Sequence, residues 1–216
     1  MSFIEVSSGV RERSVPLIMG QVLSLVAAAL GICALTTYLG RDLEFGTARI
    51  ISFVGFGMLI AQSFVAPLRR GSLGILWLGL IASAIGYGLG PFIAGYIDTN
   101  PSAVTTAVGL TALTVLGMGA AGFAIDKDLK GWMKPLSYIV LAAVFVSIGS
   151  IIFGGLGSLS PIISIIILVV SALLILVDFN YVRKHATEDD VIWLATGIFV
   201  SIINIFISLL SLFGNR

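Results

Sequence analysis

The feature that most constrains this chain is a repeated apolar run of about 20 residues, the length that a helix needs to cross a bilayer. Seven such runs lie at about 15–39, 48–68, 73–97, 103–125, 135–155, 161–182 and 191–213. Hydrophobic residues make up 58% of the chain and charged residues only 11%, unlike a soluble domain. Because backbone groups in lipid must bond internally, such runs predict helices. We therefore expect an all-α integral membrane protein with seven transmembrane helices in one domain, 15–213, after an N-terminal segment, 1–14.

The lysines and arginines of the polar connections are distributed unequally between the two predicted sides of the membrane. With a cytoplasmic N-terminus, the far side receives only Arg41, Arg49 and Arg216, and the cytoplasmic side receives all the other basic residues. Cytoplasmic loops of membrane proteins carry such an excess of basic residues. This distribution predicts a multi-pass protein of the cell inner (cytoplasmic) membrane, with its N-terminus in the cytoplasm and its C-terminus on the far side.

The charged and catalytic residue types argue against several classes of function. A net charge of +1 is unlike the basic surface that binds nucleic acid, so no nucleic-acid partner is expected. His185 is the only histidine, and the chain has no HExxH, GxSxG or GxxxxGK[ST] motif. We therefore expect no enzyme activity, no cofactor and no metal site. The lipid bilayer is the partner that the composition itself predicts.

Small residues recur at a spacing of four in the predicted helices. Helices in lipid associate through close approach and interhelical hydrogen bonds, and small residues make close approach possible. We expect packing contacts at these pairs: Gly79 with Ser83, Gly86 with Gly90, and Gly117 with Ala121.

The last apolar run carries one line of small and polar residues among Ile, Leu, Phe and Val. A spacing of four and three residues places them on one side of a helix: Gly197, Ser201, Asn204, Ser208 and Ser211. Two interpretations stay open. The helix is a central element wrapped by the others, or the line is a packing contact with a single neighbour.

Asp178 is the one acid inside an apolar run, in the stretch LLILVDFNYV. An aspartate at the centre of a membrane helix costs about 2.5–3.5 kcal/mol on insertion scales, so such a residue usually has a partner or a task. Ser164, Ser171 and Asp178 are spaced by seven and share one helix face. Asp178 is either a structural residue hydrogen-bonded near the membrane interface or a protonatable, cation-attracting gate. Arg69 and Arg70 are its plausible partners or ordinary cytoplasmic anchors.

The segment TEDD before the last run has a structural explanation. Thr187 is a suitable N-cap for the seventh helix, and Glu188, Asp189 and Asp190 lie in its first turn. Acids at that position are favourable to the helix dipole.

The last two runs resemble the transmembrane Bax-inhibitor-motif family. The resemblance rests on VDFNYV, the loop RKHATEDD and the final IFVSIINIFISLLSLFG, supported upstream by YGLGPFIAGY and DKDLKGW. It implies a fold of six helices around a central C-terminal seventh helix. Leak-forming members use two aspartates, one on each of the last two helices, with an arginine near the end of the second helix. Asp178 matches the first aspartate, and Arg69 or Arg70 matches the arginine.

Ser201 stands where the second aspartate would be, immediately before IIN. Two carboxylates can share a proton, whereas a serine can only hydrogen-bond, so the paired switch does not carry over unchanged. With a serine at this position, the last helix resembles the bacterial branch that includes YccA, a modulator of the membrane protease FtsH. The resemblance thus favours a protein that binds and modulates a membrane-bound ATP-dependent protease.

Two alternatives accompany that first choice. The protein is a pH-sensitive calcium or proton leak along Asp178, Ser201 and Asn204, closed by Arg69 or Arg70. Otherwise Asp178 only locks helix packing.

Overall fold

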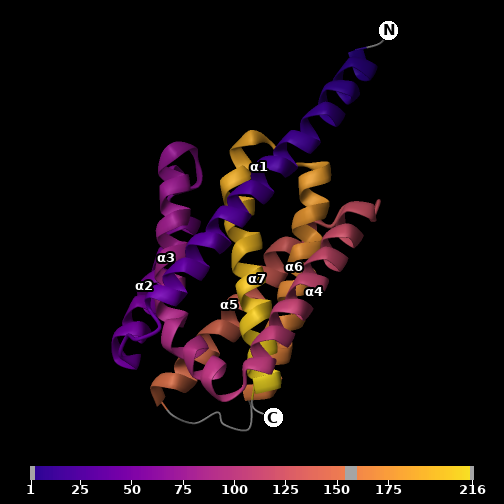
Figure 1. The fold of residues 1–216 in the computed structure, drawn as a ribbon. Coiled ribbons are helices and arrows are strands. Elements are labelled where there is room, and N and C mark those ends of the chain that lie inside the picture. The colour runs from indigo at the N-terminus through magenta and orange to yellow at the C-terminus, as the bar shows by residue number, and fades with distance from the viewer. Residues whose placement is uncertain (1–2, 154–159, 215–216) are drawn as a thin grey trace. The chain divides into compact units, whose positions relative to one another are not determined.

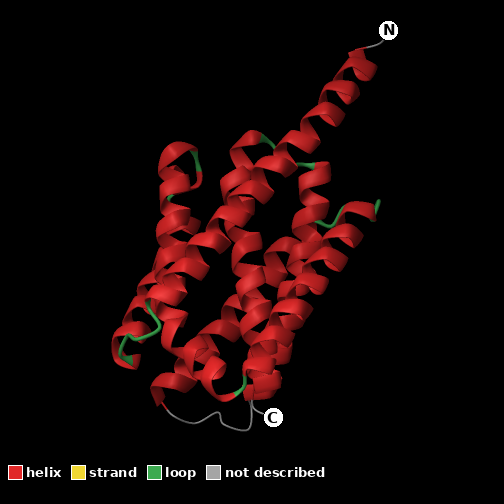
Figure 2. Ribbon diagram, viewed as in Figure 1, coloured by secondary structure: helices red, strands yellow, loops and turns green. Residues whose placement is uncertain are grey.

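The computed structural model describes residues 3–153 and 160–214, and side chains within 15–146 and 161–214. These ranges are helical almost throughout, with short loops between the helices (Figure 2). In chain order (Figure 1) the elements are α1 (Phe3–Leu39), α2 (Phe45–Phe64), the 3-10 turn η1 (Ala66–Arg69), α3 (Gly71–Thr99), α4 (Pro101–Ala124), α5 (Lys130–Phe153), α6 (Ser160–Lys184), the 3-10 turn η2 (Glu188–Asp190) and α7 (Val191–Gly214).

Six of the described helices are long and apolar enough to cross a membrane. They are α1 from Val15, α2, α3, α4, α6 from Pro161, and α7 together with η2. The remaining predicted run, 135–155, coincides with α5, but residues 154–155 and the side chains of 147–153 lie outside the described part. The seven helices match the predicted number.

Several helix boundaries differ from the predicted runs, most of all the start of α1, the end of α2 and the start of α5, which begins at Lys130 rather than 135. α1 begins at Phe3, so its backbone already passes through the segment predicted as a separate N-terminal stretch. α2 ends at Phe64, four residues before the predicted end at 68; the extended Val65 separates it from η1, and Pro67, which lacks a backbone N–H, stands in the first turn of η1. The chain then turns through η1 to Gly71, whose φ of +59° lies in the left-handed region that glycine adopts without strain.

The chain divides into two compact units. The first comprises Met1–Gly95 and His185–Phe199, and the second comprises Tyr96–Lys184 and Val200–Arg216. α7 contributes its first part to one unit and its second part to the other.

In the first unit, α3 contacts α1 and α2 through glycines. A Cβ at Gly86 would lie 2.0 Å from Thr36 Oγ1 on α1, and one at Gly88 would lie 2.0 Å from Ser52 Oγ on α2. A Cβ at Gly90 would lie 2.4 Å from the carbonyl carbon of Gly40. The predicted close approach at Gly86 and Gly90 is confirmed, because no side chain fits between these backbones.

In the second unit, α6 packs against both α4 and α5. The predicted contact at Gly117 is wrong, since a Cβ there would meet nothing within 4 Å. The close approach uses Gly119 and Gly122 instead: a Cβ at Gly122 would lie 2.1 Å from the Leu176 carbonyl oxygen. A spacing of three rather than four carries this contact, and both spacings place residues on one helix side.

α7 carries many fully buried residues. Its side chains with at most 1% exposure are Leu194, Ala195, Ile198, Phe199, Ile205 and Leu210. Of the polar line, Ser201 and Ser208 are buried, Asn204 and Ser211 are half-buried, and Gly197 is exposed. The arrangement of six helices around a central seventh stays a prediction.

Candidate functional site

Asp178 lies in α6, six residues before its end at Lys184, and its side chain is buried with 6% exposure. Among the residues that the structure describes, none donates a hydrogen bond to its carboxylate or forms an ion pair with it. A buried carboxyl without a partner is uncommon, because desolvation then costs free energy that no contact returns. Whether Asp178 is a structural residue or a gate stays a prediction.

The other two polar residues on this face of α6 are also buried. Ser171 has no exposure, and its hydroxyl is a buried polar atom without a hydrogen-bond partner. Ser164 donates a hydrogen bond to the hydroxyl of Ser211 on α7 over 3.4 Å. The line of Ser164, Ser171 and Asp178 thus faces α7 at its Ser164 end.

The contact between Ser164 and Ser211 fixes the register of the two helices, which run in opposite directions. Counting from that pair, Asn204 falls level with Ser171, and Ser201 falls four residues deeper than Asp178. Four residues are about 6 Å of helix. This count predicts that Asp178 and Ser201 are offset along the helix axis rather than side by side.

Arg69 and Arg70, predicted as gate partners, have contacts within the first unit. A guanidinium nitrogen of Arg69 donates to the Ser63 carbonyl over 2.7 Å, and its Nε is buried without a partner. Arg70 forms an ion pair with Asp189, 3.4 Å away, in which both side chains are mostly exposed. Asp189 therefore forms an ion pair, in addition to its favourable position at the start of α7.

The TEDD segment forms part of the N-terminal cap that the sequence predicts, through bonds between Thr187 and Asp190. The carboxylate of Asp190 accepts hydrogen bonds from the backbone N–H of Thr187 at 3.0 Å and from its hydroxyl at 2.9 Å. The three acids form η2, directly before α7.

Sequence reasoning missed Gln62, a buried amide in α2. Its Nε2 donates to the Leu68 carbonyl and to the Thr196 hydroxyl on α7, each over 3.2 Å. The amide thereby joins α2, the chain around η1 and the first part of α7.

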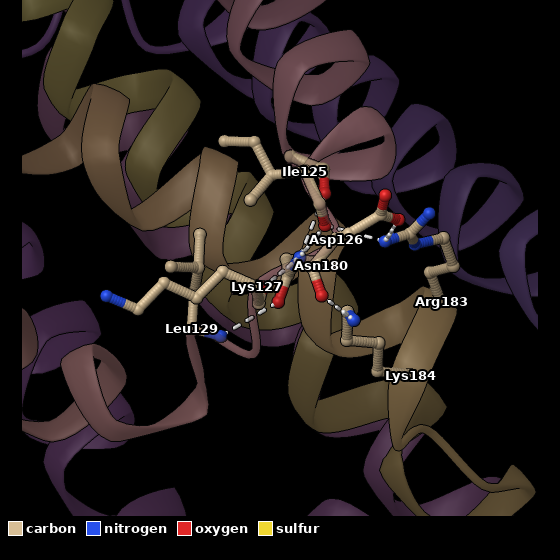
Figure 3. A network of polar contacts seen from close by, with 8 residues as sticks. Ile125, Asp126, Lys127, Leu129, Asn180, Arg183 and Lys184 are labelled. Atoms are coloured by element: carbon tan, nitrogen blue, oxygen red, sulfur yellow. Dashed lines mark hydrogen bonds and ion pairs between the residues drawn. The ribbon is translucent and has the colours of Figure 1, made fainter.

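The sequence analysis also gave no role to Asn180, which has no exposure. Its Nδ2 lies within 3.2 Å of three carbonyl oxygens, one at the end of α4 and two on the chain between α4 and α5, and its Oδ1 accepts from the Leu129 N–H (Figure 3). Asparagine within an apolar run is the signal that would have found it, since a polar side chain in a membrane helix needs partners as Asp178 does.

The apolar helices and the buried polar residues in them define a multi-pass α-helical membrane protein. The family model described as "Inhibitor of apoptosis-promoting Bax1" matches residues 16–216, and the chain belongs to this Bax-inhibitor-motif family. The family resemblance of the last two apolar runs is thereby confirmed across nearly the whole chain.

Similar proteins occur in distant bacteria. An uncharacterized protein of Pseudomonas aeruginosa is 28% identical over 214 residues, covering 96% of this chain and 93% of that protein. An uncharacterized membrane protein of Vibrio cholerae is 26% identical over 170 residues, covering 77% of this chain and 74% of its own length. A further one, from Streptococcus pyogenes serotype M6, is 26% identical with 91% of each chain covered.

Proposed function

We propose that this protein is a pH-sensitive leak for protons or cations across the membrane, with Asp178 as the gate residue. The observation that carries the proposal is a buried carboxyl to which no described residue donates a hydrogen bond. An intramembrane aspartate costs about 2.5–3.5 kcal/mol, and here no partner offsets that cost. Residues that break the rules of stable packing in this way are most often functional.

The line that contains Asp178 supports the proposal. Ser171 offers a buried hydroxyl without a partner one heptad deeper. Counting from the Ser164–Ser211 contact puts Asn204 of α7 level with it. A hydroxyl both donates and accepts hydrogen bonds, so with water in the roughly 10 Å between Asp178 and Ser171 it is suited to pass a proton on. Ser201 extends this polar line on α7, about 6 Å deeper than Asp178.

Of the two ions, the proton suits this chemistry better than calcium. Ca²⁺ takes about six to eight oxygen ligands and prefers several carboxylates. A proton needs one titratable group together with hydroxyl groups or water along its path, and Asp178 is such a titratable group. We therefore expect proton flux to exceed calcium flux in purified protein, measured with a pH dye and a calcium dye in matched liposomes. Calcium flux without proton flux would contradict this choice of ion.

A second function has its own supporting observation. Ser201 stands where leak-forming members carry the second aspartate. A serine at this position is similar to the sequence of the branch that includes YccA. On that ground the protein binds and modulates an FtsH-like membrane protease. Purification from native membranes in mild detergent should then recover the protease complex, and its absence from abundant, folded protein would count against this function.

The expected location belongs to both proposals. The excess of lysine and arginine on one side supports an inner-membrane protein with its N-terminus in the cytoplasm and C-terminus outside. The high burial of α7 supports its place as the central helix. Labelling of single cysteines introduced into the α4–α5 and α6–α7 connections, from each side of sealed vesicles, tests the orientation.

A further inference from the structure

The Asn180 side chain joins α6 to the end of α4 and to the connection between α4 and α5. Its Nδ2 lies 3.2 Å from the Gly122 carbonyl oxygen, 2.9 Å from that of Ile125 and 3.2 Å from that of Lys127. Its Oδ1 accepts from the Leu129 N–H at 3.0 Å. One amide on α6 thus satisfies four backbone groups at the end of α4 and in the connection to α5 (Figure 3).

The next turn of α6 binds the same connection. Arg183 donates to the Ile125 carbonyl over 2.6 Å and forms an ion pair with Asp126 at 3.2 Å, and Lys184 donates to the Asp126 carbonyl. Positions i, i+3 and i+4 share one helix side. Both cations also meet the carbonyl end of α4, where the helix dipole favours positive charge.

Glycines on α4 bring its backbone close enough for these bonds. Gly122 lies against the Leu176 carbonyl, and Gly119 lies against the ring of Phe179. The side of α6 that faces α4 and the connection is therefore defined by Leu176, Phe179 and Asn180, with Arg183 one turn on.

Asp178 points away from this side. It lies two residues from Asn180, and two residues correspond to about 200° of rotation in an α-helix. The side that carries Asp178 also carries Ser171 and Ser164, and Ser164 contacts Ser211 of α7. Any rotation of α6 that moves Asn180 out of the connection moves this second side away from α7.

We propose that Asn180 is a positioning residue: its amide clamps the α4–α5 connection, fixes the rotation of α6 and thereby holds Ser164 against Ser211 in the second part of α7, on the side of α6 that also carries Ser171 and Asp178. The clamp is defined by hydrogen bonds alone, and its effect on ion flux rests on the proposed leak function. Arg183 and Lys184 reinforce the clamp from the partly exposed end, where ion pairs contribute less than the buried amide.

The test measures the rotation of α6 directly. In a Cys33→Ala background, Ser164→Cys and Ser211→Cys place two thiols where hydroxyls now lie 3.4 Å apart, close enough for a disulfide after a small adjustment. The full-length protein is oxidised mildly in liposomes, and disulfide formation is followed by the loss of maleimide labelling. We expect Asn180→Ala and Asn180→Asp each to slow this cross-linking about tenfold, since even one lost buried hydrogen bond shifts an equilibrium by about that factor.

Asn180→Asp is the sharper variant because it keeps the acceptor for the Leu129 N–H while replacing the donor with a group that repels three carbonyls. Asn100→Ala is the matched control. Asn100 caps the other end of α4 through the Ala103 N–H at 3.2 Å, so its loss weakens the same helix without touching α6. Unchanged cross-linking in folded Asn180 variants, or an equal loss in Asn100→Ala, would overturn the proposal. If Asn180→Ala does not fold, the cross-linking rates of Asn180→Asp and Asn180→Ser test the proposal instead.

Flux in the same variants separates the two proposals. We expect the Asn180 variants to change the pH profile of proton flux, whereas Asn100→Ala leaves the profile unchanged. Slowed cross-linking with an unchanged profile would overturn the positioning role. Wild-type protein without proton flux would instead refute the leak function. The cross-linking rates would still test whether Asn180 fixes the rotation of α6.

Discussion

The Ser164 hydroxyl on α6 donates to the Ser211 hydroxyl on α7 over 3.4 Å, and this pair sets the register of the polar residues on the two helices. It leaves Asp178 and Ser201 about four residues apart along the helix axis, or about 6 Å. A serine at that offset does not substitute for a carboxylate that shares a proton with Asp178.

This register predicts the outcome of paired cysteine substitution. In protein without Cys33, Ser164→Cys with Ser211→Cys should form a disulfide rapidly. Asp178→Cys with Ser201→Cys should form one far more slowly, because Cβ atoms must approach to about 3.5–4.5 Å for the bond. Alkylation of the remaining thiols during oxidation gives both rates. Equal rates would show that the register is different.

Gly122 predicts a large effect from one added methyl group. The Cβ of alanine would lie 2.1 Å from the Leu176 carbonyl oxygen, so α4 and α6 must separate. We expect Gly122→Ala to lower the free energy of unfolding by about 1–3 kcal/mol, as overpacking does elsewhere. Gly117→Ala is the matched control on the same helix, since nothing lies within 4 Å of its Cβ position. Thermal unfolding in detergent should separate the two variants, and equal stabilities would contradict the packing described.

The buried pair of Gln62 and Thr196 predicts a measurable coupling. Their side chains are joined by a 3.2 Å hydrogen bond between α2 and α7. Such bonds in membrane proteins contribute on average about 0.6 kcal/mol and at most about 1.7 kcal/mol. A double-mutant cycle with Gln62→Leu and Thr196→Val should return a coupling energy in that range. Additive effects of the two substitutions would mean that the bond contributes nothing.

The exposed ion pair of Arg70 and Asp189 is expected to contribute little to the free energy of unfolding. Its side chains are 63% and 65% exposed, so water and salt screen the attraction. Asp189→Asn should change the free energy of unfolding by less than about 1 kcal/mol, and the change should shrink further in high salt. A loss of several kcal/mol in a denaturation experiment would show that the pair is part of a buried network.

The number of helices was predictable from the sequence because apolar runs of membrane length have few alternative folds. The break after Phe64 was also within reach, since Pro67 and Gly71 stand in the printed sequence. Gly86 and Gly90 were found by their spacing. Gly117 was misassigned because spacing alone does not say which side of a helix meets a neighbour.

The polar residues were harder to assign than the helices. Asp178 stood out because its charge is improbable in an apolar run. Asn180, two residues later, carries no charge and went without a role, although its amide makes four hydrogen bonds. Gln62 was missed for the same reason. The partners of both amides are distant in sequence, and their pairing depends on tertiary packing.

The gate role of Asp178 is tested by proton flux into liposomes that contain the purified protein, comparing the wild type with Asp178→Asn at acidic and alkaline pH. The amide keeps the shape of the carboxyl but cannot titrate, and Ser208→Ala controls for the loss of another buried polar group on α7. We predict flux that changes with pH in the wild type and in Ser208→Ala, and no flux above empty liposomes in Asp178→Asn. Wild-type flux that persists in folded Asp178→Asn protein, or no wild-type flux at any pH, would contradict the account.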